Sequence, residues 1–481
     1  QYIIALYGTF YAGATSTGMN FLLQPNEIIY QASDSEAKVL VTMDAFYEEN
    51  VREALSSGKT NVEVVVTTNV TDMMNISSLK IKLGKMLKKV PYGEVVPIDG
   101  IKFFEFKEIL ENYPSDKAPV VKHDPQNDIC FLQYTGGTTG PPKGAILTHG
   151  NEMANMAQVI EWLQKLLRPG EDVFISGFPF FHLAGQFFNL AANYLGAMQL
   201  LIPNPRDTDH ICKLVKQYNP TFMLNVPTLY MMLANNPKFR KLDLSSLLVY
   251  GSGAAPFPSD KIIEFEDIVG KNMVLEVYGM TEASPLVTAN PVNNERKIGT
   301  IGLPIPNTDV KIVDTIDGTK EMPIGEAGEI VIRGPQVFKG YWKKPKETQN
   351  ALRDGWFYSG DVGVMDEDGY ITVVDRTKDM IIVGGYKVFS VEVDKKMNEH
   401  PAIELCSSVG VPDPNRPETE LVKLFVALKE GHHPSEELKA DILKYAQENL
   451  AKYKIPKIIE FVKEMPLTSV GKIDKKVLRT K

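Results

Sequence analysis

Glycine, threonine and a single lysine are concentrated in one short run, TGGTTGPPK, from Thr135 to Lys143. Glycine lets backbone N–H groups converge on an anion, threonine hydroxyls add donors, and lysine supplies a positive charge. The P-loop pattern requires Gly-Lys-Ser/Thr, whereas here Lys143 follows Pro142 and precedes Gly144. The run therefore fails the P-loop pattern. On its residue types alone, a flexible surface loop is an equally good interpretation.

The stretch EVYGMTEASP places an aromatic ring, a hydroxyl and a carboxylate close together at Tyr278, Thr281 and Glu282. The ring can stack on a base, the hydroxyl can donate to a phosphate, and the carboxylate can hold Mg²⁺. The competing interpretation is a helix start that Thr281 caps, with acids in the first turn. For the stretch taken alone, the helix start is favoured.

Four further residues have side chains that a core does not require. Asp361 and Arg376 could share hydrogen bonds with a sugar, although a solvated turn is the simpler interpretation. Lys472 follows Gly471 in PLTSVGKIDKK, which read alone is a basic solvated tail. His182 lies among phenylalanines, where a hydrogen-bonded core histidine is favoured by about two to one. Neither a Ser-His-Asp order nor a histidine-rich metal pattern surrounds it, so hydrolase and metalloenzyme functions gain little support.

Alternating strands and helices must position these residues. The β-branched runs AKVLVTM (37–43) and VEVVVTT (62–68) are separated by polar helical stretches. Residues 172–185 and 245–256 each read as an apolar strand followed by a glycine-rich turn. This pattern predicts an α/β layered domain with ligand sites on the turns after the strands. After about Ile298, DVKIVD, GEIVIRG and GYITVVD predict a small β-rich subdomain, and from Thr377 onward strands and helices mix again.

Composition narrows the class of protein. The chain of 481 residues is 43% hydrophobic and 23% charged, which predicts two or three globular domains. Its net charge of −8 argues against general nucleic-acid binding. Cys130, Cys212 and Cys406 are too dispersed for a disulfide framework, and no signal peptide or membrane span is recognised, so we expect a cytoplasmic protein.

Seven motifs together resemble the adenylate-forming superfamily of acyl-CoA synthetases, adenylation domains and luciferases. In order they are YTGGTTGPPKG, FPFFHLAG, GSGAAP, YGMTE, YSGD, DRTKDMIIVGGYKVFSVEVD and PLTSVGKID, and they span essentially the whole chain. The resemblance implies an N-terminal AMP-binding domain of layered α/β subdomains over 1–376, which includes the β-rich subdomain at 298–376. A small mobile α+β domain would follow over 377–481. The family carries further N-terminal residues and the chain begins inside a predicted helix, so we expect a piece before Gln1 to be missing.

The resemblance also assigns roles in two half-reactions. In the first, Lys472, Thr281 and Glu282 would be catalytic, and Glu282 would hold Mg²⁺. In the second, Lys378 would be the hinge about which the C-terminal domain turns to bring CoA to the site. His182 would contact the acyl group. The residues assigned to ATP or AMP are Thr135, Gly136, Gly137, Thr138, Thr139, Gly140, Lys143, Gly253, Ala254, Ala255, Glu276, Tyr278, Gly279, Asp361 and Arg376, and those assigned to CoA are Gly384, Gly385, Tyr386 and Lys387.

The implied reaction joins a carboxylic acid to CoA through an acyl-adenylate, with ATP cleaved to AMP and pyrophosphate. VPTLYMMLANNP and the stretch after Val374 look most like fatty-acyl-CoA ligases, so a medium- or long-chain acid is expected. The alternatives are an aryl or 4-coumarate-type ligase, an adenylation domain that loads a carrier protein, a luciferase-like oxygenase and a non-catalytic nucleotide-binding protein. The oligomeric state is left open, with a homodimer among the options.

Overall fold

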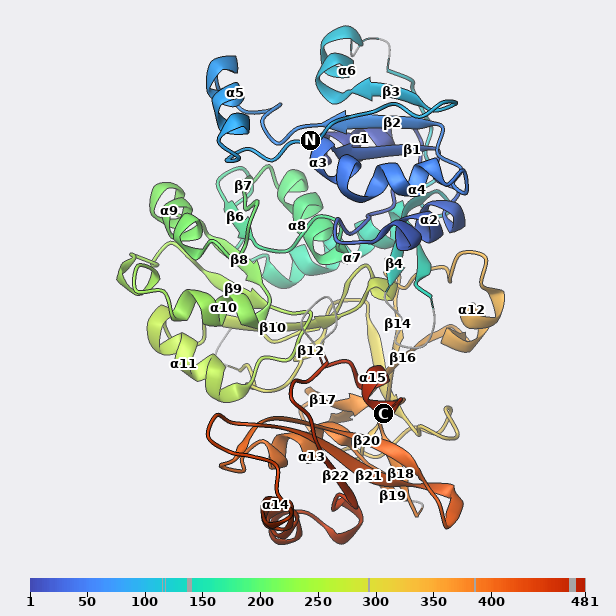
Figure 1. Ribbon diagram of the computed structural model, residues 1–481, viewed down its shortest axis with the longest axis vertical. Coiled ribbons are helices and arrows are strands. Elements are labelled where there is room, and N and C mark those ends of the chain that lie inside the picture. The colour runs from blue at the N-terminus through green and yellow to red at the C-terminus, as the bar shows by residue number, and fades with distance from the viewer. Residues whose placement is uncertain are drawn as a thin grey trace. The chain divides into compact units, whose positions relative to one another are not determined.

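The computed structural model describes residues 1–114, 116, 118–135, 141–292, 295–384, 386–466 and 473–480. The chain forms two compact units (Figure 1). The first comprises Gln1–Ile298, Pro304–Thr308 and Gly334–Leu352, and the second comprises Gly299–Leu303, Asp309–Arg333 and Arg353–Lys481.

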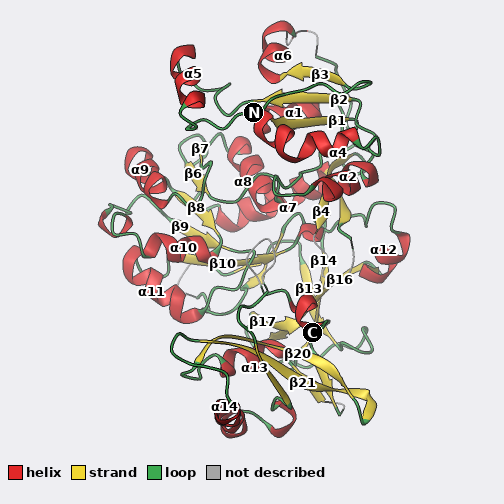
Figure 2. Cartoon of the chain, in the orientation of Figure 1, coloured by secondary structure: helices red, strands yellow, loops and turns green. Residues whose placement is uncertain are grey.

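The first unit alternates helices and strands along most of its length (Figure 2). Its helices are α1 (Tyr2–Tyr11), α2 (Pro25–Asp34), α3 (Asp44–Phe46), α4 (Arg52–Ser56), α5 (Ser78–Met86), α6 (Phe106–Asn112), α7 (His149–Leu163), α8 (Leu183–Tyr194), α9 (Thr208–Tyr218), α10 (Pro227–Ala234), α11 (Ser259–Val269) and α12 (Pro345–Ala351). Its strands are β1 (Val39–Met43), β2 (Val64–Thr68), β3 (Lys102–Glu105), β4 (Ile129–Thr135), β5 (Lys143–Thr148), β6 (Val173–Ser176), β7 (Met198–Leu201), β8 (Phe222–Asn225), β9 (Val249–Ser252), β10 (Val274–Gly279) and β11 (Leu286–Ala289).

Two parallel sheets organise this unit. One has the order β1-β2-β3. The larger one contains the consecutive strands β11-β10-β9-β8-β6-β7, in which β10 and β11 pair antiparallel and the other neighbours pair parallel. Strands of the larger sheet are covered on both faces, which is usual for parallel sheets. The sheets confirm the predicted α/β class and the predicted strands at 37–43, 62–68, 172–185 and 245–256.

Period-two alternation along the strands separates two apolar clusters, one on each face of the larger sheet. Ile175, Met223 and Tyr250 join residues of α9, α10 and α11 in one cluster. Their immediate neighbours Phe174 and Phe222 belong to the other cluster, with residues of α7 and α8. The space between the sheet and α7 and α8 contains the candidate site.

The second unit is built mainly from antiparallel strands. Its elements are β13 (Asp309–Val313), β14 (Gly328–Arg333), β16 (Trp356–Met365), β17 (Ile371–Arg376), β18 (Ile381–Val383), β19 (Tyr386–Val388), α13 (Ser390–Met397), β20 (Ile403–Asp413), β21 (Arg416–Leu428), α14 (Glu436–Asn449), β22 (Ile458–Phe461) and α15 (Lys475–Arg479). Two short strands, β12 (Leu303–Pro304) and β15 (Leu352–Arg353), lie where the chain passes from one unit to the other. The strands predicted from DVKIVD, GEIVIRG and GYITVVD are present as β13, β14 and β17.

Cys130, Cys212 and Cys406 are all buried free thiols. Among the described residues, no helix combines the length and the apolar character needed to cross a bilayer.

Candidate active site

An apolar pocket lies between the larger sheet and helices α7 and α8. Its cavity volume is about 150 Å³, and apolar side chains of β6, β8, β9, β10, α7 and α8 form most of its wall. The polar lining residues are His182, Tyr278, Thr281 and Trp162, and the Trp162 indole N–H already donates to the carbonyl of Asn290 at 3.1 Å. The remaining three come from motifs that the sequence analysis singled out.

Parallel pairing explains how these motifs meet at one end of the pocket. Strand β9 pairs in register with β10, so that Ser252 lies opposite Glu276. The turn that follows β9, at Gly253 and Ala254, therefore lies beside Tyr278 at the end of β10, and all three residues line the pocket. Ala254 has a left-handed φ of 63°, and a Cβ on Gly253 would lie 2.8 Å from the Val277 side chain. The GSGAAP turn thus allows close approach of its backbone, as a nucleotide site requires.

We call the end of the pocket beside Gly253, Ala254 and Tyr278 its mouth. From this mouth the pocket extends along the sheet. Val249, at the start of β9, and Gly253, after its end, both line it, a span of about 13 Å at about 3.3 Å per residue. Helix α8 gives a similar length, because His182 at its N-cap and Ala191 both line the pocket and lie about 14 Å apart at 1.5 Å per residue. Phe174, Phe222 and Leu195, which belong to one apolar cluster, also line the pocket.

His182 marks the mouth rather than the core. It is exposed, it caps α8, and its Nδ1 accepts a hydrogen bond from the Ala184 N–H at 3.4 Å. The interpretation of His182 as a core histidine is therefore wrong. Of its phenylalanine neighbours, Phe178 lines the pocket, whereas Phe180 stacks on Tyr2 and does not.

Thr281 and Glu282 occupy a short 3-10 turn, Thr281–Ala283, and not the first turn of an α-helix. The interpretation of Thr281 as a helix cap is therefore wrong. Gly279 precedes this turn, and a Cβ on it would overlap the carbonyl of Pro285. The turn is thereby held against the end of β10, where Thr281 lines the pocket.

The two ends of the glycine-rich loop are held together by a β-hairpin. Strands β4 and β5 are antiparallel, and their last register pair joins Thr135 to Lys143. The predicted phosphate ligands Gly136, Gly137, Thr138, Thr139 and Gly140 lie outside the described residues. Helix α2 supports the hairpin, because the Tyr30 hydroxyl donates to the carbonyl of Pro142 at 2.8 Å and the Tyr134 hydroxyl donates to Asp34 at 2.6 Å.

A segment that the sequence analysis did not single out connects this hairpin to the Thr281–Ala283 turn. It runs over residues 334–342 and pairs along β5, where its Trp342 N–H donates to Gly144 and the Ile146 N–H donates to Gly340. The same segment reaches the turn, because the Phe338 N–H donates to the Glu282 carbonyl at 2.9 Å. Two motifs that are far apart in the sequence are thereby fixed side by side.

Tyr341 lies at the centre of this junction. Its hydroxyl donates to Glu282 Oε1 at 2.7 Å, and Lys143 Nζ lies 4.6 Å from the centre of its ring. Burial and the adjacent Glu282 carboxylate raise the pKa of Tyr341 well above its ordinary value. Tyr341 therefore stays protonated, orients Glu282 and gives Lys143 an aromatic surface. The only sequence signal was a tyrosine within the short run FKGYW.

In the second unit, the predicted ribose ligands form a pair. Asp361 and Arg376 are directly opposite in strands β16 and β17, and Arg376 Nε lies 3.3 Å from Asp361 Oδ1. Arg376 remains half-exposed, with 50% of its side chain accessible, while Asp361 is mostly covered. The pair presents a carboxylate and a guanidinium on one short stretch of sheet, as hydrogen bonding to neighbouring hydroxyls would need.

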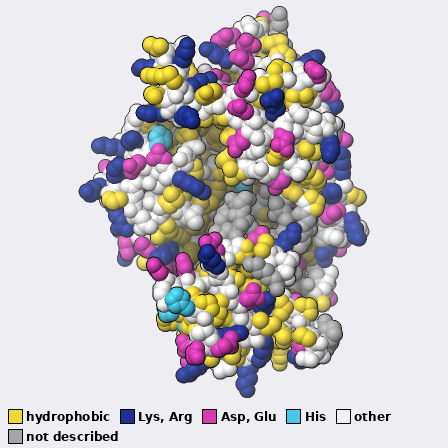
Figure 3. All heavy atoms as spheres, viewed as in Figure 1, with side chains coloured by type: hydrophobic (Ala, Val, Ile, Leu, Met, Phe, Trp, Pro, Cys, Tyr) yellow, Lys and Arg dark blue, Asp and Glu magenta, His cyan; other side chains and the backbone are white. Residues whose placement is uncertain are grey.

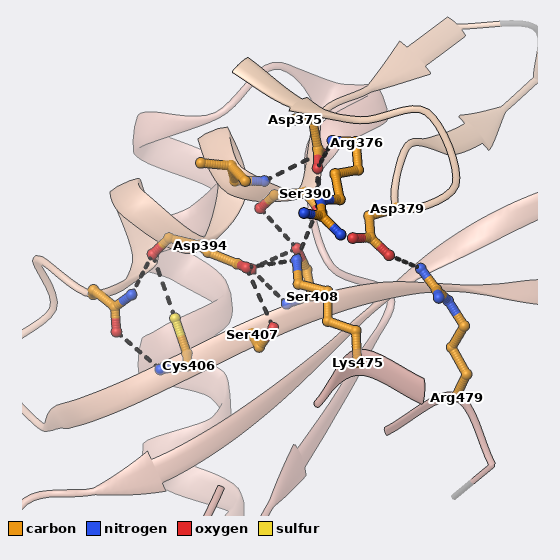
Figure 4. Close-up of polar contacts among 12 residues, drawn as sticks. Asp375, Arg376, Asp379, Ser390, Asp394, Cys406, Ser407, Ser408, Lys475 and Arg479 are labelled. Carbon is orange, nitrogen blue, oxygen red and sulfur yellow. Dashed lines mark hydrogen bonds and ion pairs between the residues drawn. The ribbon is translucent and has the colours of Figure 1, made fainter. Parts of the chain in front are cut away.

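A buried polar network includes Asp375, three residues before the predicted hinge residue Lys378 in the sequence (Figure 4). Lys475 Nζ donates to Ser390 Oγ at 2.7 Å and contacts Asp394 at 3.0 Å, and Ser390 donates to Asp375 at 2.8 Å. Burial raises the pKa of Asp394 above its ordinary value, with the Lys475 ammonium opposing the shift. The interpretation of Lys475 as part of a solvated tail is therefore wrong.

Helix α15, which carries Lys475, also contacts the turn that contains the predicted hinge residue Lys378. The Arg479 guanidinium donates to the carbonyl of Lys378 at 3.0 Å and forms an ion pair with Asp379 (Figure 4). Helix α15 thus connects the turn after β17 to the residues that follow Lys472. Lys472 itself lies outside the described residues.

Three of the four predicted CoA-binding residues, Gly384, Tyr386 and Lys387, lie in or beside the antiparallel strands β18 and β19. Gly384 has a φ of 56°, Tyr386 stacks on Tyr453 at 4.7 Å, and Lys387 is paired with Asp314 at 3.1 Å. Gly385 lies outside the described residues. The stacking and the ion pair hold the side chains that follow the glycine turn.

Comparison with known sequences assigns the family. A sequence profile described as AMP-binding enzyme matches residues 1–342, and a profile described as AMP-binding enzyme C-terminal domain matches residues 392–472. The chain belongs to the AMP-binding enzyme family. A long-chain-fatty-acid–CoA ligase of Bacillus subtilis (strain 168) is 38% identical over 485 residues, which cover 98% of this chain and 82% of the relative.

Two further relatives have different acids in their names. A feruloyl-CoA synthase of Amycolatopsis sp is 34% identical over 479 residues, which cover 99% of this chain and 86% of the relative. The solved structure of an anthranilate-CoA ligase in complex with anthranoyl-AMP superimposes with a TM-score of 0.77 at 27% identity, over 99% of this chain and 84% of that chain. These relatives confirm the adenylate-forming resemblance and place the chain among AMP-forming acyl-CoA synthetases, which are acid–thiol ligases.

Proposed function

We propose that this chain is a fatty-acyl-CoA synthetase that activates medium- or long-chain acids. The observation that supports the proposal is an apolar pocket about 13 Å long. Its polar lining residues, apart from Trp162, whose indole N–H is already bonded, are His182, Tyr278 and Thr281, all from motifs of the proposed active site. A carboxylate at the mouth would meet ATP there, and its alkyl chain would occupy the apolar interior. Each buried methylene contributes about 0.8 kcal/mol, so longer acids bind more tightly until the pocket is full.

The first half-reaction forms the acyl-adenylate. A carboxylate oxygen attacks the α-phosphorus of ATP, the bond to the β-phosphate oxygen breaks, and pyrophosphate leaves. Negative charge collects on phosphoryl oxygens, which calls for preorganised donors and cations. We assign the β- and γ-phosphates to the Thr135–Lys143 loop, the α-phosphate to Thr281, and the bridge between carboxylate and phosphate to Lys472.

The nucleoside would be held through its base and its ribose. Tyr278 would stack on adenine against the turn of Gly253, Ala254 and Ala255, which the register of β9 and β10 brings beside it. Asp361 and Arg376 would bind the ribose hydroxyls. Glu276 and Gly279, on the same strand as Tyr278, complete the proposed AMP contacts.

Glu282 is the proposed Mg²⁺ ligand. Mg²⁺ usually binds one or two carboxylates together with substrate phosphates and waters. The part of the chain that the structure describes has no group of three or more His, Cys, Asp or Glu residues placed to hold a metal. A single carboxylate oriented by Tyr341 fits an ion that arrives with ATP. When bound, Mg²⁺ would offset phosphate charge.

Removal of the Tyr341 hydroxyl tests this arrangement. We expect Tyr341→Phe to lower adenylate formation about tenfold and to raise the Mg²⁺ concentration needed for half-maximal rate, because a hydrogen bond to a charged group contributes about 1.5–3 kcal/mol. The ring beside Lys143 is retained in this variant. The measurement is pyrophosphate release against Mg²⁺ concentration.

Tyr445→Phe is the matched control, because the hydroxyl of Tyr445, on α14, also donates to a glutamate, Glu399, at 3.4 Å. Tyr445→Phe should leave both the rate and the Mg²⁺ dependence unchanged. An unchanged Mg²⁺ dependence in Tyr341→Phe would show that Tyr341 does not act through the metal ligand.

The second half-reaction would use the same site after a rotation of the C-terminal domain. We propose a boundary between residues 376 and 377 and a hinge at Lys378, a turn residue that can absorb the change in dihedral angles. Lys472 would leave, and Gly384, Gly385, Tyr386 and Lys387 would line the path of pantetheine. The CoA sulfur then attacks the acyl carbonyl, AMP leaves, and the thiol proton is released. Arg479, which donates to the Lys378 carbonyl, is placed to stabilise one hinge conformation.

The alternatives can be separated by product. The name of the feruloyl-CoA synthase keeps an aryl acid as the second candidate substrate. An adenylation domain would transfer the acyl group to a carrier protein and not to CoA, and a luciferase-like enzyme would consume O₂. Release of pyrophosphate and AMP from ATP, dependent on a carboxylic acid, is the experiment that tests the proposed function. Acyl-CoA should form only when CoA is also present.

A further inference from the structure

Residues 73–92 form a basic and apolar segment in an otherwise acidic chain. The segment, MMNISSLKIKLGKMLKKVPY, contains Lys80, Lys82, Lys85, Lys88 and Lys89 and has neither aspartate nor glutamate. The whole chain has a net charge of −8, so this segment carries a local charge opposite to that of the protein. Neither the proposed acyl pocket nor the nucleotide site uses it.

Helix α5 in this segment has no buried residue. Leu79 is 78% exposed and Met86 is 71% exposed. Leu83, which lies between them, and Leu87, which follows Met86, are also exposed. The preceding Met73, Met74 and Ile76 are exposed as well. Isolated helices of this length are marginal in water, and exposed apolar patches mark interaction sites.

The exposed side chains are arranged by the helical period. Leu79, Leu83 and Met86 are spaced i, i+4 and i+7 and form one stripe, and Lys80 and Lys82 lie on its two sides. On the other side of the helix, Lys85 lies over the ring of Tyr92 at 5.6 Å and Val90 packs at Gly84. The helix is therefore held to its own segment by one side and presents the stripe outward. Figure 3 shows apolar side chains flanked by lysines over α5, at the upper left.

We propose that residues 73–92 bind the surface of an anionic lipid membrane. A helix with a narrow apolar stripe lies in the interface with its apolar side chains among the lipid chains and its lysines at the headgroups. Lysine stems can lie along the apolar boundary while the ammonium reaches the phosphates. Each lysine near an anionic surface adds about 1 kcal/mol of attraction, so Lys80, Lys82, Lys88 and Lys89 supply the charge complementarity. A neutral or cationic partner would leave these charges unopposed.

Vesicle co-sedimentation tests the proposal with the full chain. The wild-type protein should sediment with vesicles of phosphatidylcholine containing phosphatidylglycerol, should bind vesicles of phosphatidylcholine alone at least about tenfold more weakly, and should be released by high salt. Two variants separate the contributions: Leu79→Ser/Met86→Ser removes the stripe, and Lys80→Glu/Lys82→Glu reverses the charge. Each should weaken binding to the anionic vesicles at least about tenfold. All four side chains are exposed, so neither variant should alter the circular dichroism or the thermal unfolding.

The matched control changes one exposed apolar side chain and one exposed lysine elsewhere. Ile316→Ser/Lys320→Glu lies in the second unit, where Ile316 is 82% exposed, and should bind vesicles like the wild type. Equal binding of wild type and both α5 variants would overturn the proposal, as would equal binding to neutral and anionic vesicles. Sedimentation velocity tests whether a second copy of the chain, and not a membrane, covers the α5 stripe. If the wild type is a dimer that does not bind vesicles, and Leu79→Ser/Met86→Ser dissociates that dimer, the membrane proposal is also overturned. Lipid binding is measured without substrates, so its failure would leave the proposed ligase function untouched.

Discussion

Lys472→Ala is expected to lower acyl-adenylate formation roughly 10²-fold or more, the scale of losing one preorganised electrostatic contact. In the proposed mechanism the ammonium would offset the repulsion between two anionic reactants, a carboxylate and ATP, and would stabilise the charge that develops between them. Thioester formation from presynthesised acyl-adenylate and CoA has no such pair of reactants. The same variant should therefore carry out the second half-reaction at close to the wild-type rate.

Gly385→Leu provides the opposite control. Only glycine leaves room for pantetheine to pass close to the backbone, so this variant should release pyrophosphate normally while failing to form acyl-CoA. The two half-reactions are followed separately, by pyrophosphate release and by consumption of added acyl-adenylate. If both variants lose the same half-reaction, the proposed alternation of the C-terminal domain is wrong.

Ala191→Phe is expected to shorten the acyl pocket and to lower kcat/KM for long-chain acids by about 10²-fold. Ala191 lines the pocket on α8, about 14 Å along the helix from His182 at the mouth. A phenyl ring there would exclude the end of a long alkyl chain. Loss of four methylene contacts at about 0.8 kcal/mol each corresponds to a factor somewhat above 10².

A short acid serves as the internal control for this variant. Butyrate should be activated by Ala191→Phe at nearly the wild-type rate, because its chain ends before Ala191. Circular dichroism and thermal unfolding establish that the larger side chain is accommodated. A uniform loss for butyrate and long acids in a folded variant would show that the alkyl chain does not lie along α8.

Strand-and-turn patterns allowed much of the site to be predicted from the sequence. The apolar strand before GSGAAP was predicted to end at a turn suited to a ligand site, and Gly253 and Ala254 of that turn line the pocket. For YGMTE the residues alone favoured a helix start, and only the family resemblance assigned Tyr278 and Thr281 to the site. The structure places Gly253, Ala254, Tyr278 and Thr281 at one pocket because β9 and β10 are adjacent and in register. Local pattern was sufficient for the GSGAAP turn, because the strand and its turn are adjacent in the sequence.

Long-range contacts could not be predicted in the same way. Tyr341 is 59 residues from Glu282 and reaches it because residues 334–342 pair along β5, which no local periodicity indicates. In the sequence Lys475 looks like part of a basic tail, but in the structure it forms a buried ion pair with Asp394, which lies 81 residues earlier. For His182 the phenylalanine neighbours alone suggested a core histidine, whereas its place at the α8 N-cap exposes it. The family resemblance instead assigned it to the acyl group, and it lines the pocket.

The most direct test of the account is pyrophosphate release by the wild-type protein across carboxylic acids from acetate to octadecanoate, with aryl acids included. The apolar pocket predicts that kcat/KM rises with chain length from acetate to at least the medium-chain acids, because each added methylene is buried until the pocket is full. AMP should form in equal amount to acyl-CoA when CoA is present. A preference for acetate, or for aryl acids over every fatty acid, would contradict the proposed fatty-acyl specificity.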